Sequence, residues 1–261
     1  MRRAISGETA VITGASSGIG REIALILDGM GYETVLVARR EGRLEELKQR
    51  MKNPSRTFCA DVSKESDCQR LFDEVKSDNV QILVNCAGFG AAGYFEEIPL
   101  EKELAMIDTN VKAVHILTKL FLQKFTDNDS GYILNVASSA GLMPGGPLMA
   151  TYYATKAYVV SLTNAIAAEL EDMCSNVYIG ALCPGPVDTE FNEVAQVNFA
   201  MKGITPKFCA QYAVMEMFNR KVIIIPETKM KAAALAQRLV PKSITLGVAA
   251  RYQSKKLENN D

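Results

Sequence analysis

The chain has 261 residues, and its 29 Lys and Arg are balanced by 30 Asp and Glu, which leaves a net charge of −1. Charges of both signs are interspersed, so the composition indicates no surface for a polyanion and argues against nucleic acid as a partner. A chain of this length can bury a substantial core, and no repeat or Pro/Ser-rich linker divides it. We therefore expect a single domain over residues 1–261.

Six cysteines are spread along the chain without a CxxC pair and lie among apolar neighbours. They are typical of buried thiols in a reducing compartment rather than of a disulfide framework or a metal site. The apolar run Thr9–Thr13 is too short for the core of a signal peptide, and the uncharged stretch Ser130–Thr155 contains Gly and Pro clusters that a membrane-spanning helix would not carry. We expect a cytoplasmic protein that holds no metal.

Short apolar runs rich in β-branched residues recur along the chain, with helical patterns such as Leu44–Met51 between them. Continuous rather than alternating apolar strands indicate burial on both faces, and strands separated by helices indicate parallel crossovers. The sequence thus predicts an α/β fold, a single doubly wound (Rossmann) parallel sheet of about seven strands with helices on both faces. The predicted strands are residues 10–12, 34–37, 57–59, 82–84, 132–136, 177–181 and 222–225.

A glycine-rich segment follows the first predicted strand, where such a sheet binds its ligand. It reads Thr13-Gly14-Ala15-Ser16-Ser17-Gly18-Ile19-Gly20, and a helical pattern begins near Arg21. Glycines permit a tight turn and a close approach to a pyrophosphate, and the helix N-terminus directs N–H groups at the anion. We expect Gly14, Ser16, Ser17, Gly18, Ile19 and Gly20 to bind a dinucleotide; a turn that only packs tightly is the alternative.

The second predicted strand ends in Val37-Ala38-Arg39-Arg40, without an acidic residue at its tip. An NAD site normally places Asp or Glu there, about 20 residues beyond the glycines, to bind the ribose 2′-hydroxyl. A guanidinium group can instead bind the 2′-phosphate of NADP(H). We therefore expect Arg39 and Arg40 to select NADP(H); the alternative is that they are solvated residues at the start of a helix.

From Thr9 to Pro226 the chain resembles the short-chain dehydrogenase/reductase family. The glycine segment matches that family's TGxxxGxG, and Asn85-Cys86-Ala87-Gly88 is similar to its NNAG element, with Cys in place of the second Asn. Asp61-Val62 resembles the pair that meets the adenine, and the segment 184–189, PGPVDT, resembles the PGxVxT turn at the nicotinamide. The resemblance implies further cofactor contacts at Asp61, Val62, Asn85, Ala87, Gly88, Pro184, Gly185, Val187 and Thr189.

The segment Tyr152–Lys156 contains the family's YxxxK motif, and Ser139 precedes Tyr152 by 13 residues. Positions i and i+4 share one helix face, so Lys156 can stand beside Tyr152. A second YxxxK at 252–256 has Leu239 where the serine should be and follows no strand. The resemblance implies the catalytic tetrad Asn110, Ser139, Tyr152 and Lys156, with Tyr152 and Lys156 also contacting the cofactor.

Each member of this tetrad has a physical role to play. A free tyrosine has a pKa of about 10, too high for efficient proton exchange near neutrality. The Lys156 ammonium and the oxidised nicotinamide favour the phenolate, and Ser139 polarises the substrate oxygen. By resemblance, Asn110 opens a helix locally and supports a water to Lys156. We expect an NADP(H)-dependent oxidoreductase that interconverts a carbonyl and a secondary alcohol; a non-catalytic dinucleotide sensor or a scaffold of the same fold is the alternative.

The predicted substrate pocket is bordered by 89–94, 140–149 and a substrate loop near 189–205, with few charges. Such a lining suits an apolar substrate, whether steroid-like, fatty or aromatic. The tail 227–261 carries a small basic excess. It either lies on a membrane surface or, as we favour, packs on a neighbouring subunit or closes over the pocket. Family habit implies a homodimer or a homotetramer.

Overall fold

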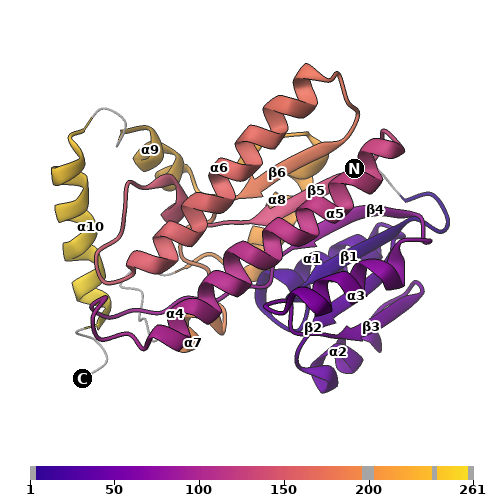
Figure 1. The fold of residues 1–261 in the computed structure, drawn as a ribbon, viewed down its shortest axis with the longest axis horizontal. Helices are drawn as coiled ribbons and strands as arrows, with labels where there is room; N and C mark the ends of the chain where they lie inside the picture. The colour runs from indigo at the N-terminus through magenta and orange to yellow at the C-terminus, as the bar shows by residue number, and fades with distance from the viewer. Residues whose placement is uncertain (1–3, 196–202, 237–239, 258–261) are drawn as a thin grey trace.

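The computed structural model describes residues 4–195, 203–236 and 240–257, with side chains as far as Arg251. Within these residues the chain forms a seven-stranded, all-parallel sheet in the order β3-β2-β1-β4-β5-β6-β7 (Figure 1). This order confirms the predicted doubly wound sheet. The strands are β1 (Thr9–Thr13), β2 (Glu33–Ala38), β3 (Ser55–Cys59), β4 (Val80–Asn85), β5 (Tyr132–Val136), β6 (Tyr178–Leu182) and β7 (Ile223–Ile224).

Helices cover both faces of the sheet, as β1 illustrates. Ala10 and Ile12 pack on one face and Val11 on the other, because successive side chains of a strand point to opposite sides. The first face is covered by α1 (Gly18–Gly29), α2 (Glu41–Lys48) and α8 (Pro206–Phe218), and the second by α3 (Glu65–Val75), α5 (Ala113–Asp127) and α6 (Ala150–Asp172).

Strand order reverses between β1 and β4, and there the two strand ends are joined by a threonine. The Thr13 Oγ1 accepts hydrogen bonds from the Cys86 N–H (3.0 Å) and the Ala87 N–H (3.2 Å) and donates to the Val84 carbonyl (3.3 Å). The glycine-rich loop and the segment after β4 are therefore held against each other at the point where doubly wound sheets bind dinucleotides.

Four shorter segments complete the carboxyl-terminal side of the sheet: α4 (Leu100–Ile107), the π-helix η1 (Asp108–Lys112), the 3-10 helix η2 (Ser139–Leu142) and α7 (Phe191–Ala195). The tail forms α9 (Thr228–Ala236) and α10 (Lys242–Leu257), which lie at the left of Figure 1, away from strands β1 to β4. Where the helices are described, none combines the length and the apolar character needed to cross a membrane.

Candidate active site

A cavity of about 790 Å³ opens at the carboxyl ends of the strands. It extends from the glycine-rich loop and the end of β2, past β4 and β5, to the tail helices. Most of the residues predicted from the sequence line it: Gly14, Ser16, Ser17, Gly18, Ile19, Arg39, Arg40, Asp61, Val62, Ala87, Gly88, Ser139, Tyr152, Lys156, Pro184, Gly185, Val187 and Thr189.

The glycine-rich loop has the shape that a phosphate requires. Gly14 has φ +68°, and a Cβ atom there would lie 2.8 Å from the Ala87 nitrogen, so a side chain would collide with the segment after β4. Ser17, in extended conformation, precedes the first turn of α1, and the first N–H groups of a helix have no partner within it. The residues present therefore fit a dinucleotide, with its pyrophosphate at the N-terminus of α1.

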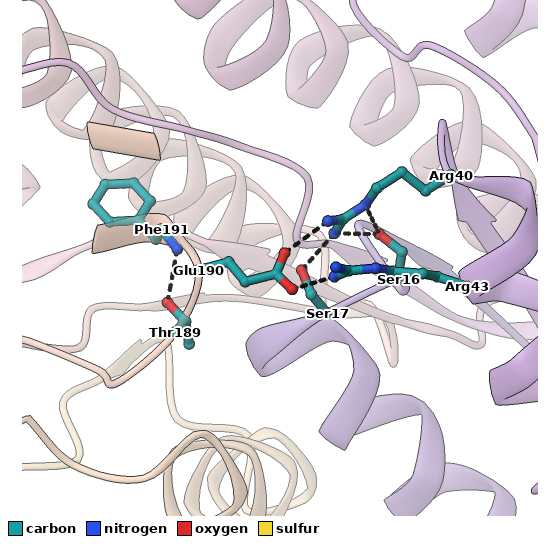
Figure 2. Close-up of polar contacts among 7 residues, drawn as sticks. All are labelled: Ser16, Ser17, Arg40, Arg43, Thr189, Glu190 and Phe191. Atoms are coloured by element: carbon teal, nitrogen blue, oxygen red, sulfur yellow. Dashed lines mark hydrogen bonds and ion pairs between the residues drawn. The ribbon is translucent and has the colours of Figure 1, made fainter. Parts of the chain in front are cut away.

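Arg40 and Arg43, which we call the arginine pair, stand beside this loop at the start of α2 (Figure 2). The Arg40 guanidinium donates to the hydroxyls of Ser16 and Ser17, each at 2.9 Å. Both guanidinium groups bind the carboxylate of Glu190, and the Arg40–Glu190 distance is 2.7 Å. These hydrogen bonds, first those from Arg40 and then those from Arg43, lower the pKa of Glu190.

Arg43 and Glu190 are absent from the set predicted from the sequence. A signal for Arg43 was available, because it lies three residues after Arg40 and such residues are neighbours on a helix. Arg39 lines the cavity and is exposed. Beyond the end of β3, the Asp61 carboxylate accepts hydrogen bonds from the N–H (3.2 Å) and the hydroxyl (2.8 Å) of Ser63.

Tyr152 lies at the centre of the cavity, 8% exposed. Its hydroxyl is hydrogen-bonded by Ser138, the residue before the serine predicted from the spacing. Ser139 also lines the cavity, and its backbone N–H donates to the Pro184 carbonyl at 2.8 Å. The structure thus places the Ser138 hydroxyl, rather than that of Ser139, on the tyrosine oxygen.

Lys156 is one helical turn from Tyr152 and 5% exposed, as the i, i+4 spacing predicts. Its Nζ donates to the Val136 carbonyl at 2.9 Å and lies 5.9 Å from the centre of the Tyr152 ring. Burial raises the pKa of Tyr152 to about 12, although the bond from Ser138 opposes the rise. This direction is opposite to the expectation from the charge of Lys156, because removing the hydroxyl from water disfavours the phenolate.

Asn110 lies in the π-helix η1, fully buried behind the cavity wall. Its Nδ2 donates to the Phe89 carbonyl (2.9 Å) and to Thr155 Oγ1 (3.1 Å), and its Oδ1 accepts from the Phe89 N–H (3.1 Å). The side chain therefore fixes the segment after β4 to helix α6. The π-helix is the local opening that the family resemblance implied.

Asn85 and Gly20, both predicted to contact the cofactor, do not line the cavity either. The Asn85 Nδ2 donates to Asn135 Oδ1 (2.9 Å) and to Thr118 Oγ1 (3.2 Å) inside the core between β4, β5 and α5. Gly20 lies under the loop, where a Cβ atom would come within 2.5 Å of the Gly14 carbonyl oxygen. Both residues thus shape the backbone that forms the site.

The far end of the cavity is apolar. Phe89, Met143, Met149, Phe191 and Val194 line it, as the pocket prediction proposed, whereas Tyr94 is 62% exposed outside it. Tyr153 also lines the cavity. The tail contributes a further wall, formed by Met230, Ala233, Ala234, Val248 and Ala249. Of the positions that the sequence left open for the tail, closure over the pocket agrees with this arrangement.

A glycine-rich loop at the reversal point of a doubly wound sheet, followed by a buried Tyr–Lys pair in the same cavity, defines a dinucleotide-dependent oxidoreductase. The sequence profile of the family described as short chain dehydrogenase matches residues 8–199. The chain belongs to the short-chain dehydrogenase family.

Relatives and solved structures agree with this assignment. An uncharacterized oxidoreductase of Staphylococcus epidermidis is 34% identical over 191 residues, which cover 72% of this chain and 82% of that protein. A short-chain dehydrogenase from Sphingobium yanoikuyae in complex with NADPH has a TM-score of 0.80 and 27% identity, covering 88% of this chain and 94% of its own. A short-chain dehydrogenase/reductase from Burkholderia phymatum in complex with NAD has a TM-score of 0.81 and 26% identity, covering 90% and 94%.

Proposed function

We propose that this chain is an NADP(H)-dependent oxidoreductase that interconverts a carbonyl and a secondary alcohol on an apolar substrate, with Tyr152 as the general acid and base. The observation that carries the proposal is the buried Tyr152 hydroxyl, bonded by Ser138, in the cavity that ends at the arginine pair. The cofactor, when bound, supplies or accepts the hydride.

The choice of NADP(H) is supported by the charges beside the glycine-rich loop. The arginine pair and the hydroxyls of Ser16 and Ser17 form a group of donors at the end of β2. A 2′-phosphate presents several acceptor oxygens and a double negative charge, which such donors bind well. Solved relatives include complexes with NADPH and with NAD, so the preference is argued from this chain's own residues.

In the direction of reduction, the Tyr152 hydroxyl donates its proton to the carbonyl oxygen of the substrate. Ser138 hydrogen-bonds the same oxygens and stabilises the charge that develops on them. The Lys156 ammonium favours the phenolate that remains, and Asn110 holds the backbone of Phe89 and the side chain of Thr155 around this pair. Oxidation of an alcohol uses the same groups in reverse.

The apolar substrate is inferred from the wall opposite the cofactor loop. Methionine and aromatic side chains there are joined by small aliphatic residues of α9 and α10. Such a lining binds a ketone of steroid-like, fatty or aromatic character better than a charged sugar. Because the tail helices form part of the wall, we assign the tail to the pocket rather than to a membrane surface.

Tyr152→Phe tests the proposal directly. Loss of the proton donor should lower kcat on apolar ketones by about 10²- to 10⁴-fold while the affinity for NADPH stays unchanged. Tyr158→Phe is the matched control, because Tyr158 lies in the same helix and hydrogen-bonds the exposed His115 instead. If wild-type protein binds NADPH but turns over no member of a ketone panel, the chain is a dinucleotide sensor.

Oligomeric state and location belong to the same proposal. Leu100, Leu104 and Ile107 of α4 are large apolar side chains exposed at the surface. A second copy of the chain would cover them, which supports a homodimer or a homotetramer. The six cysteines are all free, which is typical of the reducing cytoplasm. Sedimentation of the purified chain as a monomer at micromolar concentration would contradict this part of the proposal.

A further inference from the structure

The arginine pair already holds an anion, and that anion comes from a distant part of the chain. Glu190 is 150 residues from Arg40 in sequence, yet its carboxylate bridges both guanidinium groups (Figure 2). The hydroxyls of Ser16 and Ser17 complete the donor set around Arg40. A carboxylate oxygen thus occupies the position where this chain would hold the phosphate of a ligand.

The three ion-pairing side chains are accessible to solvent. Arg40 is 44% exposed, Arg43 is 46% exposed and Glu190 is 37% exposed. Ion pairs of this exposure contribute little to stability, so a ligand with more charge can displace the carboxylate. A phosphate carries about two negative charges and three acceptor oxygens, whereas a carboxylate carries one charge and two oxygens.

Glu190 is directly followed by a residue that contacts the tyrosine. The Phe191 ring lies 5.3 Å from the Tyr152 ring, and the Phe191 N–H donates to Thr189 Oγ1 at 3.3 Å. Figure 2 shows Glu190 and Phe191 pointing to opposite sides of their segment. One short segment therefore connects the arginine pair with the wall around Tyr152.

We propose that Glu190 determines cofactor specificity by competing with the 2′-phosphate of NADP(H) for Arg40 and Arg43, so that the phosphate releases Glu190 and repositions Phe191 against Tyr152. This inference rests on the proposed NADP(H) function. NADH carries a hydroxyl at the same ribose position, which leaves the bonds between Glu190 and the arginine pair in place. The release is thus specific to the phosphorylated cofactor.

The first experiment compares Glu190→Gln with Glu193→Gln. Glu193 lies three residues further along the chain, in helix α7, and among the described residues no ion pair involves it, so the control removes an equal charge. Titrations follow nicotinamide fluorescence, since the chain has no Trp. Glu190→Gln should bind NADPH about three- to tenfold more tightly than wild type, with NADH affinity within about twofold, and Glu193→Gln should match wild type for both.

The second experiment follows α7 without any turnover. Val194→Trp introduces a single tryptophan at a half-exposed position of α7. Its emission should change on addition of adenosine 2′,5′-bisphosphate, which carries the 2′-phosphate, and should not change with adenosine 5′-monophosphate. In the double variant that combines Val194→Trp with Glu190→Gln, the two nucleotides should no longer differ in their effect on the tryptophan emission.

The outcomes separate the two proposals. If wild-type protein binds NADPH but Glu190→Gln leaves that affinity unchanged or weakens it, or if both nucleotides change the emission equally, the competition is overturned and the NADP(H) function stands. A loss of NADH affinity in Glu190→Gln would mean that Glu190 binds the ribose, which also overturns it. If wild-type protein binds no NADPH, the proposed function fails and the inference fails with it.

Discussion

At the scale of single residues, Ser138 and Ser139 differ in what they contact although they are neighbours in the chain. Ser138 is extended, accepts from the Ala140 N–H at 3.1 Å and hydrogen-bonds Tyr152. Ser139 begins η2, and its backbone is held by the Pro184 carbonyl. Of the two hydroxyls, the one on Ser138 is placed to meet a substrate oxygen beside Tyr152.

Replacing each serine separately should distinguish their roles. Ser138→Ala removes the hydrogen bond to the reacting oxygens and should lower kcat/KM by about 10²- to 10³-fold, whereas Ser139→Ala should stay within about threefold of wild type. Steady-state kinetics on one ketone with NADPH measures both. The opposite ranking would return the catalytic role to Ser139.

The reason why spacing selected Ser139 is physical. Tyr152 and Lys156 lie four residues apart in one helix, so their separation is fixed by the helical repeat. The residues between the serines and Tyr152 include η2 and a loop through Pro144 and Pro147, whose length no repeat fixes. Counting back from Tyr152 is therefore reliable along the helix, whereas across the loop it does not decide between Ser138 and Ser139.

The value of kcat/KM should fall at alkaline pH because Lys156 loses its proton there. Burial lowers the pKa of Lys156 from 10.5 to about 8, so the ammonium predominates below pH 8 and is lost above it. Tyr152, with its pKa raised to about 12, stays protonated throughout this range. For ketone reduction kcat/KM should therefore be constant below about pH 7 and fall as the pH rises through 8. A flat profile up to pH 10, with NADPH affinity constant, would contradict this assignment.

At the scale of elements, helix α10 is the part of the pocket that the sequence least revealed. From the sequence, three positions of the tail remained open: on a membrane surface, against a neighbouring subunit or over the pocket. Val248 and Ala249 line the cavity, yet Val248 is 63% exposed and Ala249 is 8% exposed. Helix α10 thus contributes only a narrow strip of its surface to the cavity wall. Which residues form this strip could be identified only from the position of the helix in the fold.

A charge on this strip should separate substrate binding from cofactor binding. Ala249→Glu places a carboxylate against the apolar wall and should raise KM for an apolar ketone by about tenfold or more, because a buried charge without a partner is costly. NADPH affinity should not change. Ser243→Glu adds the same charge at an exposed position of α10 and should behave like wild type. Equal effects of the two variants would place the substrate elsewhere.

At the scale of the whole molecule, the sheet, its parallel direction and the positions of its strands were predicted from apolar runs and the helices between them. This succeeded because strands β1, β2, β4, β5 and β6 are buried on both faces and each crossover requires a helix. The ion pair between Arg43 and Glu190 joins residues 147 apart in the sequence, and no local pattern relates them. Features of the site that depend on such distant contacts could therefore be identified only from the folded structure.

Cofactor binding should be visible in the stability of the entire fold. A ligand present at 100 times its Kd stabilises the native state by about 2.7 kcal/mol, which for a chain of this size corresponds to about 5–10 °C in Tm. Dye-based thermal denaturation with NADPH should show this increase, and an equal concentration of NADH should give a smaller one. An equal shift with both cofactors would contradict selection by the arginine pair.

The residues of the cavity wall come from two parts of the chain. This division affects how the substrate range of such an enzyme can change. Arg40, Tyr152 and Lys156 all precede Pro226, whereas α9 and α10 add further apolar side chains to the cavity wall after it. Chimeras that exchange only the segment after Pro226 would therefore replace one part of the apolar wall and leave Arg40, Tyr152 and Lys156 in place. Under the proposed function, recombination at this one junction would change the substrate range without changing the groups that transfer the proton.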